Sequence, residues 1–294
     1  MDKQEVYRPI NTLGEDPERW GAIKTKLPRI ELLRLWRCEW ETERLHSQVF
    51  LYVTLTFGSA IKLKLFYVAF RSVVVFGRLM RALPRLSSLA FHRVQFKRGY
   101  HVAGAVRMPG SRRLDAADLR YSDDISDFFV SIGAHLRHLT CYRRDFEKHS
   151  ELLTVSAESL LFLKIYLRID LTPAVNLRIL SVNGNLDDIA KAVSVLLRMS
   201  VPKLVEVTVG SWLLYVKTPV SVQDILNTVY DDCFVQMDHT LSGKQFPALG
   251  KITFLLRYVG RRSVSEVMDV IFESSWGTLL ASNLPALHAS GGVL

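Results

Sequence analysis

A repeated segment constrains the fold of this chain more than any other feature of its sequence. Residues 27–40 align without gaps on residues 83–96, with the shared pattern Leu-Pro-Arg-Φ-x-x-Leu-x-Φ-x-Arg-Φ-x-aromatic, in which Φ is apolar. A third copy keeps Leu136, Leu139, Cys141, Arg143 and Phe146. Fainter copies hold Leu63-Leu65-Val68-Phe70, Leu114-Ala117-Leu119, Leu160-Leu163-Ile165, Leu177-Leu180-Val182, Leu204-Val207-Val209 and Leu249-Ile252-Phe254. Such self-similarity indicates a fold built from repeated units.

Each copy predicts a short strand, and the segments between copies predict helices. The Leu-x-x-Leu-x-Leu core alternates with period 2, which places its apolar side chains on one face of a strand. Stripes of apolar residues at i, i+3, i+4 and i+7 predict helices over residues 76–83, 125–132, 222–229 and 264–271, with a longer one over 186–197. An apolar residue before proline recurs where helix should give way to strand, in Leu27, Leu83, Val201, Phe246 and Leu284.

This alternation predicts an α/β fold, specifically a leucine-rich-repeat-like solenoid with degenerate repeats, a curved parallel sheet and helices on the convex side. One unit has too few apolar side chains to offset its ordering entropy, so neighbouring units must share a core. An ordinary doubly wound α/β domain is the alternative. We expect an N-terminal flank over residues 1–26 and the solenoid over 27–294. We also expect truncation at the C-terminus, because Leu284-Pro285 restarts the motif near the chain end.

The Leu-Pro-Arg-Φ-x-x-Leu-x-Φ ladder, closed by an aromatic residue, resembles the leucine-rich-repeat region of fungal F-box proteins over residues 27–287. The resemblance implies a solenoid that captures a substrate protein, while an N-terminal F-box docks onto a cullin–RING ubiquitin ligase. Residues 1–26 are too short and too polar for an F-box, and Leu27-Pro28 leads into a strand pattern. The resemblance therefore implies an unidentified protein client as partner. It implies a ligase adaptor as a second partner only if an F-box is supplied elsewhere.

The candidate partner-binding residues occupy the seventh and eighth places of the motif, counted from Ile30. These side chains should point out of the core, and strands stack about 4.8 Å apart, so equivalent residues form columns. The candidates are Trp36, Arg37, Phe66, Tyr67, His92, Arg93, Tyr142, Arg143 and Tyr166, with Arg120 and Tyr121 in an interrupting copy. Trp, Tyr and Arg are enriched at binding hot spots. Alternatively, the rings pack between repeats and the arginines are simply solvated.

The charge balance offers a second function. The chain has 38 Lys and Arg residues against 29 Asp and Glu, a formal net charge of +9 and a pI near 9.5, as many nucleic-acid-binding proteins do. Its arginine doublets, such as Arg112-Arg113 and Arg261-Arg262, are scattered, and no known nucleic-acid-binding signature accompanies them. A basic nucleic-acid-binding solenoid and an inactive truncated paralogue are the alternatives to a protein-recognition module.

We predict no catalysis, cofactor or metal site. The Gly-x-Ser-x-Gly, Gly-x-Gly-x-x-Gly and His-Glu-x-x-His motifs do not occur. A phosphate loop ending at Gly243-Lys244 would need glycine where Asp238 stands. Cys38 and Cys141 fall on core positions, and the aspartates before Cys233 disfavour its thiolate. The histidines do not pair at metal-ligand spacing.

The sequence also bears on the compartment. Three cysteines are not a disulfide framework, and no Asn-x-Ser/Thr sequon occurs, so a reducing interior is favoured over secretion. The longest uncharged apolar run, residues 47–61, is shorter than the roughly 18–20 residues of a membrane span. We expect no membrane partner and a cytoplasmic or nuclear location.

Overall fold

The computed structural model describes residues 30–40, 48–97, 114–142, 146–166, 174–185, 196–197, 201–214, 231–259 and 273–290. The chain has an α/β fold and divides into two compact units, Met1–Ser156 and Ala157–Leu294. The expected N-terminal flank and the helices expected over 222–229 and 264–271 lie outside the described residues, as does most of 186–197.

The first unit alternates strands and helices along the chain. Its elements are β1 (Leu32–Trp36), β2 (Glu39–Trp40), α2 (Gln48–Phe57), β3 (Lys62–Phe66), β4 (Ala69–Phe70), α3 (Val73–Ala82), β5 (Ser88–His92), β6 (Gln95–Phe96), β7 (Ala116–Arg120), α4 (Asp123–Ser131), β8 (His138–Tyr142) and α5 (Phe146–Ser156). The helices predicted over 76–83 and 125–132 are confirmed as α3 and α4. The two aspartates at 123 and 124 form the first turn of α4, where negative charge is favourable.

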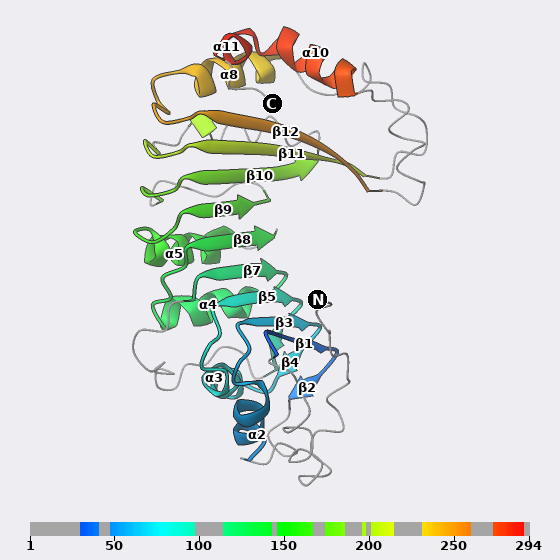
Figure 1. Cartoon of the computed structure of the whole chain (residues 1–294), viewed down its shortest axis with the longest axis vertical. Helices are drawn as coiled ribbons and strands as arrows, with labels where there is room; N and C mark the ends of the chain where they lie inside the picture. Colours follow the sequence, from blue (N-terminus) through cyan, green and yellow to red (C-terminus); the bar gives the residue numbers. More distant parts are fainter. Residues whose placement is uncertain are drawn as a thin grey trace. The chain divides into compact units, whose positions relative to one another are not determined.

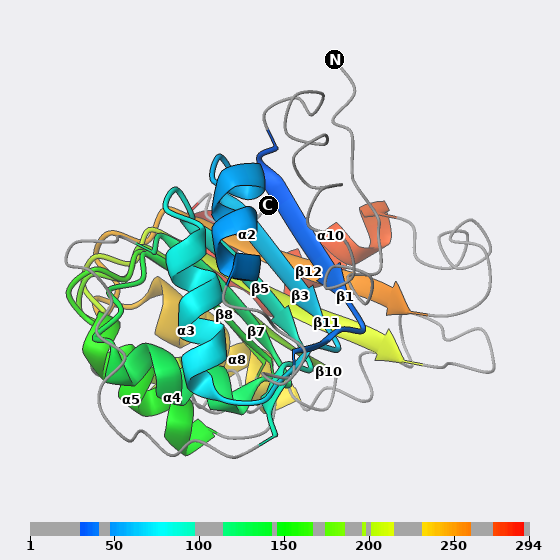
Figure 2. The same cartoon turned by 90° about the horizontal axis from the view of Figure 1, so that it is seen from below.

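The strands of this unit are parallel and follow one another in chain order, β1-β3-β5-β7-β8, with a second small sheet ordered β2-β4-β6 (Figure 1). Helices α2 to α5 lie on one side of the larger sheet (Figure 2). The opposite face of that sheet is therefore left without a helix from this unit's described residues.

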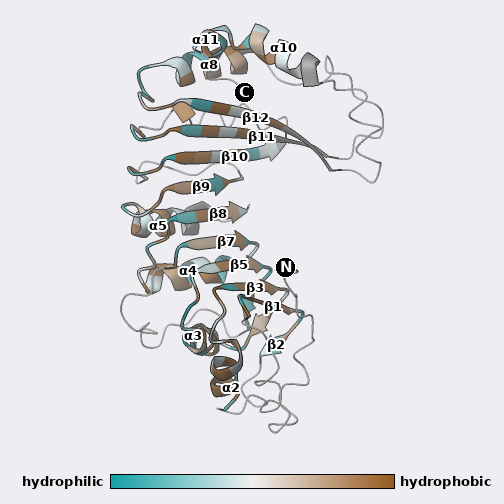
Figure 3. Cartoon of the chain, viewed as in Figure 1, coloured by the Kyte–Doolittle hydropathy of each residue, from teal (hydrophilic) through white to brown (hydrophobic). Residues whose placement is uncertain are grey.

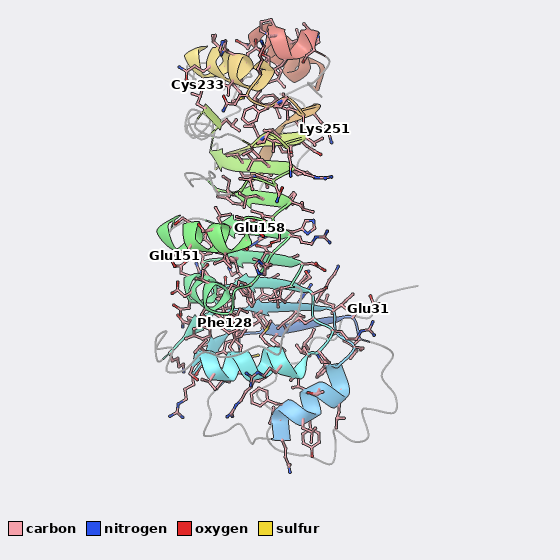
Figure 4. All side chains as sticks on the ribbon, turned by 90° about the vertical axis from the view of Figure 1, so that its left-hand side faces the viewer. Glu31, Phe128, Glu151, Glu158, Cys233 and Lys251 are labelled. Carbon is pink, nitrogen blue, oxygen red and sulfur yellow. The ribbon has the colours of Figure 1, made fainter. Side chains whose placement is uncertain are left out.

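The fourth and sixth motif places form the core side of the sheet, as the period-2 pattern predicts. In β1, β3 and β5 the buried pairs are Leu33 and Leu35, Leu63 and Leu65, and Leu89 and Phe91. Helices α2 and α3 are rich in hydrophobic residues (Figure 3). Between helices and sheet, Phe76 packs on the rings of Phe70, Phe91, Phe96 and Phe128 at centroid distances of 4.9–5.9 Å. Phe128 comes from α4 (Figure 4).

In the first unit, every strand of the larger sheet after β1 begins with the same pair of backbone hydrogen bonds. Two consecutive N–H groups donate to a single carbonyl of the preceding copy, which is the two-against-one arrangement of a β-bulge. The donors and acceptors are Ile61 and Lys62 to Glu31, Ser87 and Ser88 to Ile61, Asp115 and Ala116 to Ser87, and Arg137 and His138 to Asp115, at 2.8–3.1 Å. Sequence copies that look degenerate therefore share one geometry.

The recurring apolar-Pro pair makes a turn before the strand. The N–H of Leu86 donates to the carbonyl of Leu83 at 3.2 Å, and the same bond joins Leu204 to Val201 and Leu249 to Phe246 at 3.1 Å. Proline is the second residue of each turn, where its fixed φ suits the backbone. The prediction that Leu83-Pro84 ends a helix is confirmed, because α3 stops at Ala82.

The second unit contains β9 (Phe162–Ile165), β10 (Ile179–Asn185), β11 (Glu206–Leu214), α8 (Asp231–Ser242), β12 (Lys251–Val259), α10 (Glu273–Asn283) and α11 (Pro285–Ala289). Its strands are parallel and again in chain order, β9-β10-β11-β12. The bulge recurs here, with Arg178 and Ile179 donating to the carbonyl of Leu161. From β10 on the strands are longer, so the last copies differ from the first.

One prediction for this unit is wrong. Leu284-Pro285 does not restart a strand, since it opens the short helix α11 with proline in its first turn. Proline is as suitable at the start of a helix as in the turn that precedes a strand. The carboxylate of Asp238 in α8 accepts the N–H groups of Ala286 (3.0 Å) and Leu287 (2.8 Å). That contact from a distant segment selects the helix.

Candidate functional site

The seventh motif place forms a column across the open face of the first unit's larger sheet. Strand register places Trp36 beside Phe66, Phe66 beside His92, His92 beside Arg120, and Arg120 beside Tyr142. We call these five residues the strand column. The Trp36 and Phe66 rings lie 6.5 Å apart and the Phe66 and His92 rings 6.2 Å apart, while the Arg120 guanidinium lies 4.2 Å above the Tyr142 ring. Arg120 thus continues the column, instead of interrupting it, by stacking as a planar cation.

The eighth place forms a second column with an unusual backbone. Arg37, Tyr67, Arg93 and Tyr121 have φ values of 51°, 56°, 53° and 53°, and they are the only non-glycine residues of positive φ in the described part of the chain. We call them the corner column. For a residue with a Cβ this conformation costs roughly 1–2 kcal/mol, and neither Arg nor Tyr favours it. A ladder of four such residues is a strained feature repeated in four successive copies.

The corner column turns the chain from the larger sheet into the smaller one. The N–H groups of Arg37, Tyr67 and Arg93 donate to the carbonyls of Phe66, His92 and Arg120 at 2.8–2.9 Å. The residue after each corner is buried: Cys38, Val68, Val94 and Ser122. At the last corner, Ser122 Oγ accepts the N–H of Val94 (3.0 Å) and Asp124 Oδ2 that of Phe96 (2.9 Å), so the start of α4 replaces a further strand. The rung bonds offset the backbone strain.

The guanidinium groups of the corner column lie over rings of both columns. The Arg93 guanidinium lies 5.4 Å from the Tyr67 ring centroid and 5.7 Å from that of Tyr121, and Arg37 lies 5.9 Å from the Trp36 centroid. Trp36, Tyr67 and Tyr121 are nevertheless 52%, 42% and 46% exposed. The register confirms the prediction that these residues come together in columns. The rings also contact rings of the adjacent copies, so the alternative in which they pack between repeats remains beside the binding prediction.

Charge on this face is mostly positive. Arg34 and Lys64 are register neighbours on β1 and β3, although like charges placed opposite each other are unfavourable. Asp118 holds Arg120, with oxygen to nitrogen distances of 3.0–3.3 Å. Partial burial, Arg120 and Arg93 together lower the pKa of His92, against an opposing effect of Asp118. His92 is therefore neutral at neutral pH, and the positive charge of the face comes from arginine and lysine.

The remaining predicted site residues fall elsewhere. Arg143 lies outside the described residues, and Tyr166 follows β9 in the second unit. In that unit the seventh place holds Asn183 and Gly210, which are buried. A Cβ on Gly210 would lie 2.5 Å from Asn183 Oδ1, so a ring does not fit there. After Tyr166, the seventh place therefore holds no ring in β10 or β11.

Sequence reasoning missed three parts of this site. The left-handed corners carry no signal in the residue types, since the four positions hold only Arg and Tyr. Tyr121 belongs to the copy that was expected to interrupt the columns, yet its ring lies under the Arg93 guanidinium, as the Tyr67 ring does. The Arg34–Lys64 pair was also missed, although counting the fifth motif place across copies would have found it.

The strain at the corner column can be measured by comparing two substitutions at one position. Both Tyr121→Gly and Tyr121→Ala remove the ring, but only glycine adopts positive φ without strain. We expect the glycine variant to be more stable than the alanine variant by about 1 kcal/mol in urea unfolding. Ala90→Gly, in a strand of ordinary φ on the same face, should instead lose about 0.5–1 kcal/mol. Equal stability of the two Tyr121 variants would contradict the assigned backbone.

The cysteines have structural positions. Cys38, Cys141 and Cys233 are buried thiols that form no disulfide, which confirms the prediction that Cys38 and Cys141 act as small core residues. Burial, with a smaller effect from Asp118, raises the pKa of Cys141 far above its usual range. Among the described residues no group of three His, Cys, Asp or Glu side chains could hold a metal ion. No described helix is both long and apolar enough to span a bilayer.

Thiol labelling tests this burial. In the native protein we expect Cys141 to react with an aqueous thiol reagent at least about 100-fold more slowly than in denaturant, because thiolate formation and access both require local opening. All three thiols should titrate once the chain is unfolded. Fast labelling of Cys141 in the folded protein, located by peptide mass, would contradict its place in the core.

The comparisons with known proteins assign no family. No protein-family model matches the chain, and no curated protein matches it in sequence.

Proposed function

We propose that each unit is built as a leucine-rich-repeat-type solenoid. A doubly wound sheet reverses its strand order at a switch point, whereas β1-β3-β5-β7-β8 and β9-β10-β11-β12 follow the chain without reversal. The repeated bulge and the repeated apolar-Pro turn also support repeats of common origin. In a stack of this kind each repeat contacts only the repeats on either side of it, and the strand face is left available to a ligand.

The function that the geometry supports best is non-catalytic recognition of a protein. One observation carries this proposal: the exposed corner column and Trp36 adjoin the half-buried remainder of the strand column, on a sheet face that no described helix of the first unit covers. Large rings and arginine dominate the energetics of protein interfaces, and a contiguous exposed apolar surface generally marks an interaction site. By its resemblance to F-box receptors, the partner is a client protein presented for ubiquitylation.

The test compares two doubly substituted proteins in affinity purification from cells. Tyr67→Ala with Tyr121→Ala removes two exposed rings of the corner column, whereas Leu51→Ala with Leu55→Ala removes two exposed leucines from α2. We expect the first pair to lose a set of co-purifying proteins that the second retains, with both variants melting like the unsubstituted protein. Identical protein sets from the two variants would refute the proposal. Recovery of RNA in place of protein would favour nucleic-acid binding.

The link to a ubiquitin ligase has its own readout in the same experiment. If a second chain supplies the F-box, cullin-ligase adaptor components should co-purify with both double variants, because the docking surface would be separate from the corner column. Their absence from every sample would remove the ligase part of the proposal and leave protein recognition standing.

A further inference from the structure

The two arginines of the corner column lie over aromatic rings and have no anionic partner among the described residues. Among the described residues, the guanidiniums of Arg37 and Arg93 make stacking contacts on rings, and neither has a hydrogen bond or ion pair. Stacking uses the face of a guanidinium and leaves its N–H edge free, and that edge matches a carboxylate in bidentate geometry. The N–H groups of both arginines are thus available to an anion.

The charge around this column is not balanced within the described residues. Lys62 and Lys64 on β3 have no ion-pair partner there, and Lys64 faces Arg34 across the strand pair. Asp118 is paired with Arg120 and Glu39 with Lys97, while Glu31 lies beside Lys62 at the start of β1, at the opposite end of the strand from the corner column. Uncompensated charge of one sign on one face favours a ligand of the opposite sign.

The spacing of the two free arginines identifies a backbone conformation. Arg37 and Arg93 are two rungs apart, with Tyr67 between them. At about 4.8 Å per rung this is about 9.6 Å. A polyproline II helix repeats every three residues, or about 9.3 Å, and so places every third side chain on one face. A β-strand ligand repeats its face every two residues, or about 6.8 Å, and does not match.

We propose, building on the protein-recognition function, that the corner column binds an extended acidic segment of the partner protein in polyproline II conformation, with carboxylates at every third residue. The carboxylates meet Arg37 and Arg93, and the intervening residues lie against Tyr67 and Trp36, as proline-rich ligands lie in aromatic-lined grooves. Single-stranded nucleic acid, which binds by stacking bases on aromatic rings beside positive charge, is the competing ligand, and the test below includes it.

Peptide binding tests the chemistry and the register together. The probe is a fluorescent peptide of about nine residues made of repeated Glu-Pro-Ala units. Its controls are the same composition with the glutamates adjacent, and the Gln-Pro-Ala counterpart. We expect the regular acidic peptide to bind about 10-fold more tightly than the clustered one, and the neutral one to show no binding. Binding should weaken as salt is raised.

The variants place the site on the protein. Arg93→Gln should weaken peptide binding about 10-fold or more, and Arg93→Lys should restore only part of it, because lysine keeps the charge and loses the planar fork. Arg78→Gln makes the same charge change on an exposed residue of α3 and should leave binding within about two-fold. Equal effects of Arg93→Gln and Arg78→Gln would overturn the assignment.

The outcomes separate this inference from the function on which it rests. If neither acidic peptide binds, yet the Tyr67 and Tyr121 double variant still loses its partners in cells, the acidic segment is wrong and protein recognition stands. If the regular and clustered peptides bind equally, the polyproline II register is wrong. If oligo(U) binds more tightly than the acidic peptide and displaces it, the ligand is nucleic acid and the inference fails.

Discussion

Replacing Phe76 by alanine is expected to lower the free energy of unfolding by about 3–5 kcal/mol. Phe76 is fully buried on α3, and its ring contacts four others, from β4, β5, β6 and α4. Neighbours from so many elements have little freedom to collapse into the space the ring leaves, so both transfer and cavity costs apply. Urea unfolding followed by far-UV circular dichroism and tryptophan fluorescence measures the loss.

The control for this variant lies two residues away on the same helix. Val74 is 46% exposed, and Val74→Ala should change the free energy of unfolding by no more than about 0.5 kcal/mol. Equal losses for Phe76→Ala and Val74→Ala would mean that α3 is not seated on the sheet as described. The comparison also matters for the binding site, because the core beneath the strand column and the corner column positions both of them.

Replacing Asp238 by alanine is the second change of large expected effect, at about 3 kcal/mol. The Asp238 carboxylate is buried, and its two oxygens accept the N–H groups of Ala286 and Leu287. Hydrogen bonds to a charged group contribute about 1.5–3 kcal/mol each. Alanine leaves two donors at the start of α11 without this acceptor, where side-chain capping normally satisfies them.

Two further variants refine the test of Asp238. Asp238→Asn keeps one acceptor oxygen and should lose roughly half as much as the alanine variant. Gln236→Ala removes an exposed side chain of the same helix and should have little effect. Hydrogen exchange gives a local readout: the amides of Ala286 and Leu287 should exchange faster in Asp238→Ala. Unchanged protection of these amides would show that the carboxylate does not hold α11.

Elements governed by local periodicity were predictable. The apolar residues at the fourth and sixth places of each copy are buried, and the stripe that includes Phe76 and Leu79 forms the core face of α3. His138 is exposed at the start of β8 and the adjacent Leu139 is buried, as the alternation of a strand requires. These features depend on the pattern within one copy, so neighbouring residues suffice to specify them.

Elements selected by a distant contact were not predictable. Leu284-Pro285 has the same local pattern as Leu83-Pro84, yet one opens a helix and the other precedes a strand. The difference is Asp238, 48 residues from the amide it caps. Gly210 likewise occupies a place that holds an aromatic ring in earlier copies, and a Cβ there would lie 2.5 Å from Oδ1 of the neighbouring Asn183.

The same distinction between local pattern and distant contact applies to the candidate site. The sequence alone determined which residues share a column, because a strand with period 2 and copies in register leave the seventh and eighth places no other arrangement. Tertiary structure decided that Arg37, Tyr67, Arg93 and Tyr121 adopt left-handed corners, and that Arg93 is stacked between two tyrosines. Those states are unfavourable or undefined in an isolated copy, and only the bonds and rings supplied by the next copy stabilise them.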